Sequence, residues 1–199
     1  MTAGTALEPR ENRSLDAAVT GGLVAVMFGG AIFGFFYAWV CSTMWGLDDA
    51  DPRVAIAAMQ SMNASVRNAV FFPAFFLTPA VMGLVALLAW RARRRASAVL
   101  MTVAALVYLA GGLLLTMMVN VPMNEDLAAV SVPGSAEEAR RIWEDYSGRW
   151  QIYNQVRTIA SGASLLLAAT ALTRLRRWTP GLHGRLPGGG QGDAGTPQP

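Results

Sequence analysis

The sequence predicts an all-α membrane protein, a bundle of four transmembrane helices with both chain ends in the cytoplasm. Hydrophobic residues make up 53% of the 199 residues, and the mean hydropathy of +0.35 is above that of a typical soluble domain. Charged residues account for only 15% of the chain, and they gather between long uncharged runs instead of alternating along amphipathic helices. Composition and charge pattern together therefore indicate a membrane domain.

Four runs with little or no charge are long enough to cross a bilayer, for which about 20 residues suffice. We expect the spans at about residues 17–41, 69–90, 96–119 and 150–173, within a membrane domain of residues 17–174. The second run contains Pro73 and Pro79, so its helix should be kinked, with neighbouring groups satisfying the carbonyls that the prolines free. Short loops or helices between the spans are expected on the external face.

The segments outside the spans set the expected topology. Residues 1–16 should form a flexible cytoplasmic lead, and residues 175–199, rich in Gly and Pro, a disordered cytoplasmic tail. Arginines cluster at 91–95 and at 174–177, and the positive-inside rule places both clusters in the cytoplasm. The acidic loop between the third and fourth spans then lies outside, which agrees with an even number of crossings.

Residues that usually hold cofactors or act as nucleophiles are scarce. The chain has one cysteine, Cys41, and one histidine, His183, which falls in the Gly/Pro-rich tail. Haem, zinc and dicopper sites are therefore disfavoured, as are Ser/His/Asp and Cys/His catalytic arrangements. The basic residues are all arginines in the positions that membrane topology requires, so nucleic-acid binding is not expected.

Polar side chains gather where three spans meet the external face. They include two trios stepped by three and four residues, a spacing that puts each trio on one helix face. The trios are Gln60, Asn63 and Arg67 before the second span, and Trp150, Asn154 and Arg157 at the start of the fourth. Asn120 and Asn124 follow the third span, and Tyr37 and Tyr153 add aromatic rings at the same level. Topology therefore predicts one pocket, toward the external face.

Arg157 is the most informative residue of this group. A guanidinium about two turns inside a span is costly against lipid and normally faces the bundle interior or water. Its planar fork suits an anion or an enolate oxygen. In an alternative interpretation, Arg157 extends to the interface or pairs with an acidic residue such as Glu125. Independently, Asn120 and Asn124 would cap the end of the third helix and brace the Pro122 turn, and the aromatic residues would form a belt at the membrane surface.

Three motifs, in order along the chain, resemble those of a known family. They are Met59-Gln60-x-x-Asn63, Asn120-Val-Pro-Met-Asn124-Glu125 and Trp150-x-x-x-Asn154-x-x-Arg157-Thr158. Over about residues 17–172 the sequence resembles the anthrone-oxygenase-like family of small four-helix membrane proteins. The resemblance implies a cofactor-independent monooxygenase that oxidises a flat aromatic polyketide with dioxygen as co-substrate.

The resemblance also implies roles for the polar residues. Arg157 would hold the substrate oxyanion, and Asn154, Asn124 and Asn63 would donate hydrogen bonds to the substrate carbonyl and the peroxy intermediate. The substrate-binding residues would be Trp150, Tyr153, Gln60, Asn120 and Tyr37. The core has no histidine base, so proton removal would fall to water, to Glu125 or to the acidity of the substrate.

The sequence is also compatible with a second function. The same polar cluster would serve a non-enzymatic membrane module that binds a lipophilic ligand or a partner subunit. The expected partners are membrane lipids and a hydrophobic aromatic small molecule, in a monomer or a homo-oligomer of the cell membrane.

Overall fold

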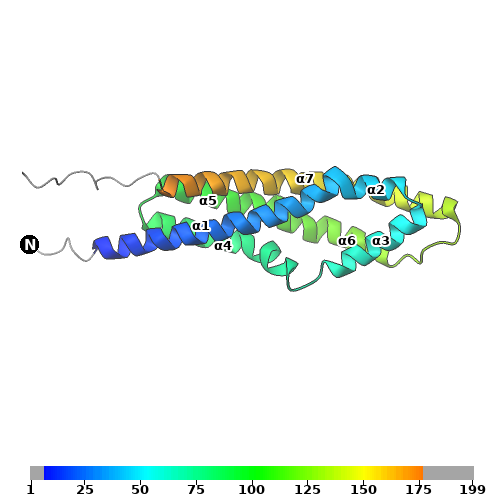
Figure 1. Ribbon diagram of the computed structural model, residues 1–199, viewed down its shortest axis with the longest axis horizontal. Helices are drawn as coiled ribbons and strands as arrows, with labels where there is room; N and C mark the ends of the chain where they lie inside the picture. Colours follow the sequence, from blue (N-terminus) through cyan, green and yellow to red (C-terminus); the bar gives the residue numbers. More distant parts are fainter. Residues whose placement is uncertain (1–6, 177–199) are drawn as a thin grey trace, which may run out of the picture.

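The computed structural model describes residues 7–176, and these residues are almost entirely helical (Figure 1). Four helical runs in this part of the chain are long and apolar enough to cross a membrane: Asn12–Asp49, Phe71–Arg91, Arg95–Ala128 and Ala136–Leu175. The predicted all-α fold with four spanning helices is confirmed, and the chain is a multi-pass membrane protein. Residues 1–6 of the expected lead and residues 177–199 of the expected tail, His183 included, lie outside the described residues.

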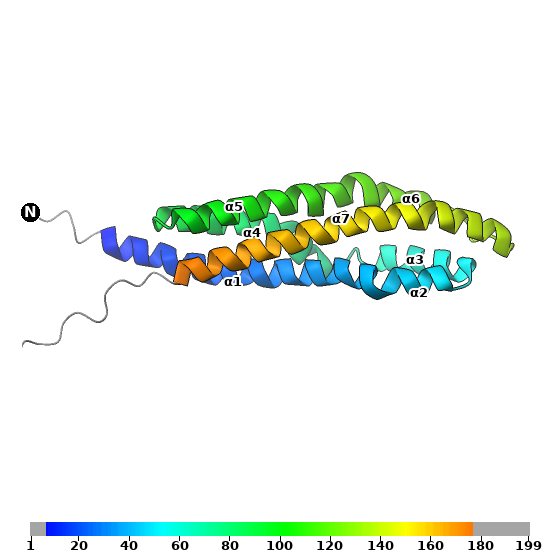
Figure 2. The same ribbon diagram turned by 90° about the horizontal axis from the view of Figure 1, so that it is seen from above.

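The bundle is a closed ring of long helices. Its members are α1 (Leu7–Ala38), α4 (Phe71–Arg91), α5 (Arg95–Val107) and α7 (Ala136–Arg176). Each packs against two others, in the ring order α1, α4, α5, α7. Figures 1 and 2 show neighbouring helices running in opposite directions, with the start of α1, the α4–α5 turn and the end of α7 at one end. The arginines of residues 91–95 and Arg174 therefore share this end, where the sequence expects the cytoplasm.

Helices continue beyond the expected spans. α7 contains 41 residues, and at 1.5 Å per residue its length of about 60 Å is twice the thickness of a hydrocarbon core. It begins at Ala136, whereas the expected span begins at residue 150, and α1 begins at Leu7, ahead of the expected residue 17. Hydropathy marks the membrane surface, but a helix continues into water because Glu and Arg are good helix formers. The domain boundaries given above therefore stay predictions about the hydrophobic segments.

Short helices extend the bundle at the end opposite the arginines. After α1 come the π-helical turn η1 (Trp39–Thr43), α2 (Met44–Asp49) and α3 (Pro52–Ser65). The third spanning run continues from α5 through the π-helical η2 (Tyr108–Leu114), which packs against α4 and α7, and η3 (Thr116–Asn120) into α6 (Val121–Ala128). Ile56, Met59, Leu127 and Trp143 are among the buried residues that join these helices to α7. The short helices expected between spans are therefore present, and they have a core of their own.

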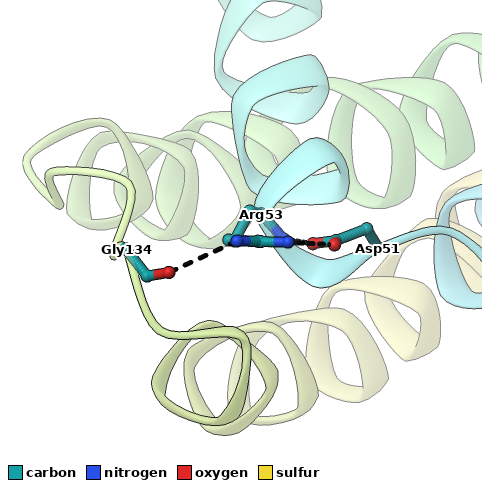
Figure 3. A network of polar contacts seen from close by, with 3 residues as sticks. All are labelled: Asp51, Arg53 and Gly134. Atoms are coloured by element: carbon teal, nitrogen blue, oxygen red, sulfur yellow. Dashed lines mark hydrogen bonds and ion pairs between the residues drawn. The ribbon is translucent and has the colours of Figure 1, made fainter.

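The α2–α3 connection is fixed by one side chain. Asp51 is the N-cap of α3, with Pro52 in the first turn, and its Oδ1 accepts a hydrogen bond from the backbone N–H of Arg53 at 2.9 Å. Nε and Nη2 of Arg53 donate to the same carboxylate at 3.0 and 2.6 Å, and Nη1 donates to the carbonyl of Gly134 at 3.3 Å (Figure 3). Arg53 thereby ties the start of α3 to the loop before α7.

Pro79 lies inside α4 and Pro73 in its first turn. Pro79 has no N–H to donate to the carbonyl of Phe75, four residues earlier. The Tyr108 hydroxyl donates to that carbonyl at 2.9 Å. The prediction that a neighbouring group satisfies a freed carbonyl is confirmed for Pro79, while the kink stays a prediction.

Candidate functional site

A pocket of about 300 Å³ lies at the level where α4 begins, bounded by α1, α3, α4, η3, α6 and α7. Eight of its 18 lining residues are aromatic: Phe35, Phe36, Trp39, Phe71, Phe72, Phe75, Phe76 and Trp150. Its volume is at the lower end of the range of about 300–1,000 Å³ typical of ligand sites. The pocket therefore suits a small, flat, apolar molecule.

The rings of α4 line the pocket because of their spacing. Phe71 and Phe75, four residues apart on one helix face, stack with centroids 5.2 Å apart, and Phe72 and Phe76 meet edge to face at 5.4 Å. Phe35 of α1 contacts Phe71 with centroids 4.9 Å apart. These pairs stiffen two walls of the pocket without any polar group.

Arg157 contributes the charge at the buried side of the pocket. Arg157 is only 5% exposed. Its guanidinium lies over two aromatic rings, with the central carbon 4.6 Å from the centroid of Phe36 and 5.1 Å from that of Trp150. Such stacking favours a cation over an aromatic face. The alternative that Arg157 extends to the interface is wrong, because the side chain is enclosed. Pairing with Glu125 is also wrong, because that carboxylate pairs with Arg67 at 3.3 Å.

Two polar groups position the guanidinium. Nη2 donates to Oδ1 of Asn154 at 2.9 Å, and Nη1 donates to the hydroxyl of Thr116 at 3.3 Å. Asn154 in turn donates from Nδ2 to the carbonyl of Phe36 at 3.2 Å. Nε of Arg157 is buried without a hydrogen-bond partner. The arginine therefore keeps unused donor capacity, while both ends of the Asn154 amide are engaged.

Asn63, expected from its spacing, and Asn124, expected from topology, both bring amide groups to the pocket. Oδ1 of Asn124 accepts from the Tyr146 hydroxyl at 2.8 Å and from Nε1 of Trp150 at 2.9 Å. Nδ2 of Asn63 is buried and has no partner. Arg67 and Glu125 also line the pocket, with side chains 52% and 59% exposed.

Several expected site residues do not line this pocket. Nε2 of Gln60 donates to the carbonyls of Leu127 and Val130 at 2.8 and 2.9 Å, so Gln60 closes the end of α6. Tyr37 is 50% exposed and stacks on Phe33, because its helix face points out of the bundle. Tyr153 is half-buried on another side of α7.

Asn120 is fully buried, and neither atom of its amide has a hydrogen-bond partner. It stands at the N-cap position of α6, but its side chain makes no capping hydrogen bond, and η3 continues directly into α6. Neither Asn120 nor Asn154 lines the pocket, and Asn154 contacts it only through Arg157. The structure thus brings together Arg157, Asn63, Asn124 and Trp150 of the predicted set.

Sequence reasoning did not single out the α4 phenylalanines or Thr116. The run Phe71-Phe72-x-x-Phe75-Phe76 carries a usable signal, since i, i+4 aromatic pairs form a ring ladder. Thr116 and Trp39 occur in π-helical turns, and such turns are frequent at functional sites. Among residues 7–176, no three His, Cys, Asp or Glu side chains gather as a metal site would require.

Fold and site define a four-helix membrane protein with an aromatic pocket around a buried arginine. A family model described as anthrone oxygenase matches residues 62–167, more than half of the chain. The chain belongs to the anthrone oxygenase family, as its motifs suggest. The match includes Asn63, Asn124 and Arg157, while the α1 wall of the pocket lies outside it. No curated protein and no solved structure gave a significant match.

Proposed function

We propose that the protein is a membrane-embedded oxygenase that oxidises a flat aromatic, anthrone-like substrate with dioxygen and without a conventional cofactor. The observation that carries the proposal is the buried guanidinium of Arg157, to which no carboxylate in the described residues is paired. A buried cation without a counter-ion is costly, and an anionic ligand offsets that cost. Family membership supports the same substrate class.

The pocket suits a substrate that is apolar except for one acidic oxygen function. Its aromatic walls match a fused-ring plane, and Arg157 is the buried charged residue among those that line it, since Arg67 and Glu125 pair at the exposed rim. An anthrone becomes such an anion when it loses the proton on the carbon opposite its carbonyl, because the negative charge moves to the oxygen. Arg157 would stabilise this enolate electrostatically in surroundings of low dielectric constant.

The reaction balances with dioxygen alone. The enolate carbon forms a bond to one oxygen atom of dioxygen, and the peroxide takes up a proton to become a hydroperoxide. Loss of the remaining hydrogen from that carbon breaks the oxygen–oxygen bond, leaving a quinone carbonyl and one molecule of water. Dioxygen is fully reduced by the substrate, so one oxygen atom enters the product and the other leaves as water.

The lining residues have distinct roles in this proposal. Arg157 holds the oxyanion, and the unpartnered Nδ2 of Asn63 donates to a substrate or peroxide oxygen. Trp150 supplies an apolar wall and stacks on the guanidinium. Asn154 does not line the pocket and acts as a positioning residue through its contact with Arg157. Thr116 also holds Arg157, and it lines the pocket itself. Asn124 lines the pocket and fixes Trp150.

Glu125 is the candidate base. It is the carboxylate that lines the pocket, and its partial exposure allows the proton to leave to water. Its ion pair with Arg67 holds it at the rim at 3.3 Å. Glu125→Gln should therefore slow enolate formation while leaving Arg157 and the aromatic walls in place.

Isotopically labelled dioxygen tests the proposal. Purified protein in detergent should convert anthrone to anthraquinone faster than heat-inactivated protein, with one labelled oxygen atom per quinone and equal amounts of dioxygen consumed and quinone formed. Hydrogen peroxide should not accumulate. Tight binding of anthrone with no product above the spontaneous background would contradict the oxygenase and favour a lipophile-binding module.

A further inference from the structure

The pocket has two different rims. On one side lie Arg67 and Glu125, whose charged side chains are 52% and 59% exposed. On the other side lie Phe72, Phe76 and Met117, which are 41%, 40% and 42% exposed although they also line the pocket. The deep lining residues Phe36 and Phe75, by contrast, are almost completely buried. A side chain that lines a pocket and is also exposed stands at its mouth.

The apolar rim belongs to the membrane-spanning part of the chain. Phe72 and Phe76 lie on α4, and Met117 lies on η3, within two of the helical runs apolar enough to cross a membrane. Their surroundings are apolar as well, because Leu77, Leu114 and Met118 are 49%, 43% and 73% exposed. An exposed apolar surface on a spanning helix meets lipid chains, since no water is present there.

The polar rim is closed by an ion pair. Arg67 follows α3 and Glu125 lies on α6, so the 3.3 Å contact between Nη2 and Oε1 joins the two sides of the pocket. A ligand arriving from water would have to separate these charges and pass its rings between them. A ligand arriving from lipid meets only rings and a thioether. The two rims therefore differ in what they admit.

We propose that the pocket opens laterally to the bilayer, between Phe72 and Phe76 on α4 and Met117 on η3, and takes up a flat apolar molecule dissolved in the membrane. The identity of this molecule rests on the proposed function, whereas the position of the mouth rests on the exposures of the three rim residues. Fused aromatic rings partition strongly into lipid, so the membrane concentrates the ligand at this mouth. The Arg67–Glu125 pair then serves as the closed aqueous wall.

The position of the mouth is tested without any assay of activity. Cysteine is introduced as Phe76→Cys or Met117→Cys in a Cys41→Ser background, labelled with a nitroxide and reconstituted into liposomes. Leu106→Cys, an exposed position on α5 away from the pocket, is the lipid-facing control, and Val132→Cys in the α6–α7 loop is the aqueous control. Both rim labels should be accessible to dioxygen and shielded from a water-soluble nickel chelate, as at Leu106. Nickel accessibility like that at Val132 would overturn the proposal.

Uptake through the mouth is tested with the same variants and anthraquinone as the probe. Anthraquinone in liposomes should quench the pocket tryptophans Trp39 and Trp150 of the reconstituted protein. Coupling N-cyclohexylmaleimide to the Phe76→Cys or Met117→Cys variant should slow this quenching at least about tenfold, whereas the same reagent on Leu106→Cys should leave it unchanged. Uptake by the wild type that neither plug slows would overturn the lateral mouth and leave the oxygenase proposal standing. Absence of uptake in the wild type would contradict both.

Discussion

The hydroxyl of Tyr108 on η2 donates a hydrogen bond to the backbone carbonyl of Phe75 on α4 at 2.9 Å. Pro79 leaves this carbonyl without its helical donor, and Tyr108 is fully buried. Phe75 lines the pocket and stacks on Phe71. The contact therefore joins the helix that carries the aromatic wall to its neighbour in the bundle.

Tyr108→Phe should lower the free energy of unfolding by about 1–3 kcal/mol, because it leaves a buried carbonyl without a donor. In a Pro79→Ala background the new N–H can satisfy that carbonyl, so the same substitution should cost clearly less. Unfolding titrations of the four combinations in mixed micelles measure the coupling. Equal costs of Tyr108→Phe in the two backgrounds would show that the carbonyl does not depend on the hydroxyl.

The amide oxygen of Asn124 should contribute to stability as a hydrogen-bond acceptor. Asn124→Ala leaves the buried donors of Tyr146 and Trp150 without their acceptor, so we expect a loss of about 1–3 kcal/mol of unfolding free energy for each donor. Asn124→Asp keeps the acceptor and should retain most of the stability. Thermal unfolding in detergent compares the two variants. Equal destabilisation by both would contradict the acceptor role.

Gly111 on η2 faces Ala160 on α7 at very close range. A Cβ at Gly111 would lie 2.5 Å from that of Ala160, so Gly111→Ala must push the two helices apart. Overpacking of this kind costs about 1–3 kcal/mol, and adding Ala160→Gly should recover most of it. Gly83→Ala on α4, with open space around the new Cβ, is the matched control. Equal unfolding temperatures of Gly111→Ala and Gly83→Ala would contradict this packing.

Asp51 should make the α2–α3 connection sensitive to acid. Hydrogen bonds from Arg53 lower the pKa of the Asp51 carboxyl from 3.8 to about 2. Because the folded pKa lies below the unfolded one, the stabilising contribution is complete above about pH 4 and is lost as the pH falls through about 2. A carboxyl carbon NMR titration should give a midpoint near 2 in the wild type and a higher one in Arg53→Gln. Identical midpoints in the two proteins would contradict the contact.

Much of the fold could be predicted because the length of each apolar run and the positions of the arginines can be read directly from the sequence. Run length indicates a membrane span, and the arginines indicate its cytoplasmic end. The burial of Arg157 also followed from a local argument, since a charge inside a span has few tolerable positions. The prediction that Asn63 and Asn124 share one pocket followed from their place at the same end of the bundle. Their shared presence in the pocket lining supports that reasoning.

Other parts of the site were not predictable from the sequence. Phe72 and Phe75 look alike there, yet one lies at the pocket mouth and the other is buried, because only packing decides which face meets lipid. Gln60 has the spacing of a pocket residue, but the carbonyls at the end of α6 capture its amide. Each π-helical turn changes the helix face on which the following residues lie, and no residue type predicts such a turn.

The most direct test of the central claim is the aerobic turnover of anthrone by the wild type, Arg157→Gln and Arg149→Gln, each corrected for spontaneous oxidation. Arg149 is an exposed arginine on the same helix and serves as the matched control. Loss of the buried charge should lower kcat by about 100- to 1,000-fold, as for other groups that stabilise an oxyanion. Arg149→Gln should be as active as the wild type. Wild-type turnover in Arg157→Gln would contradict the account.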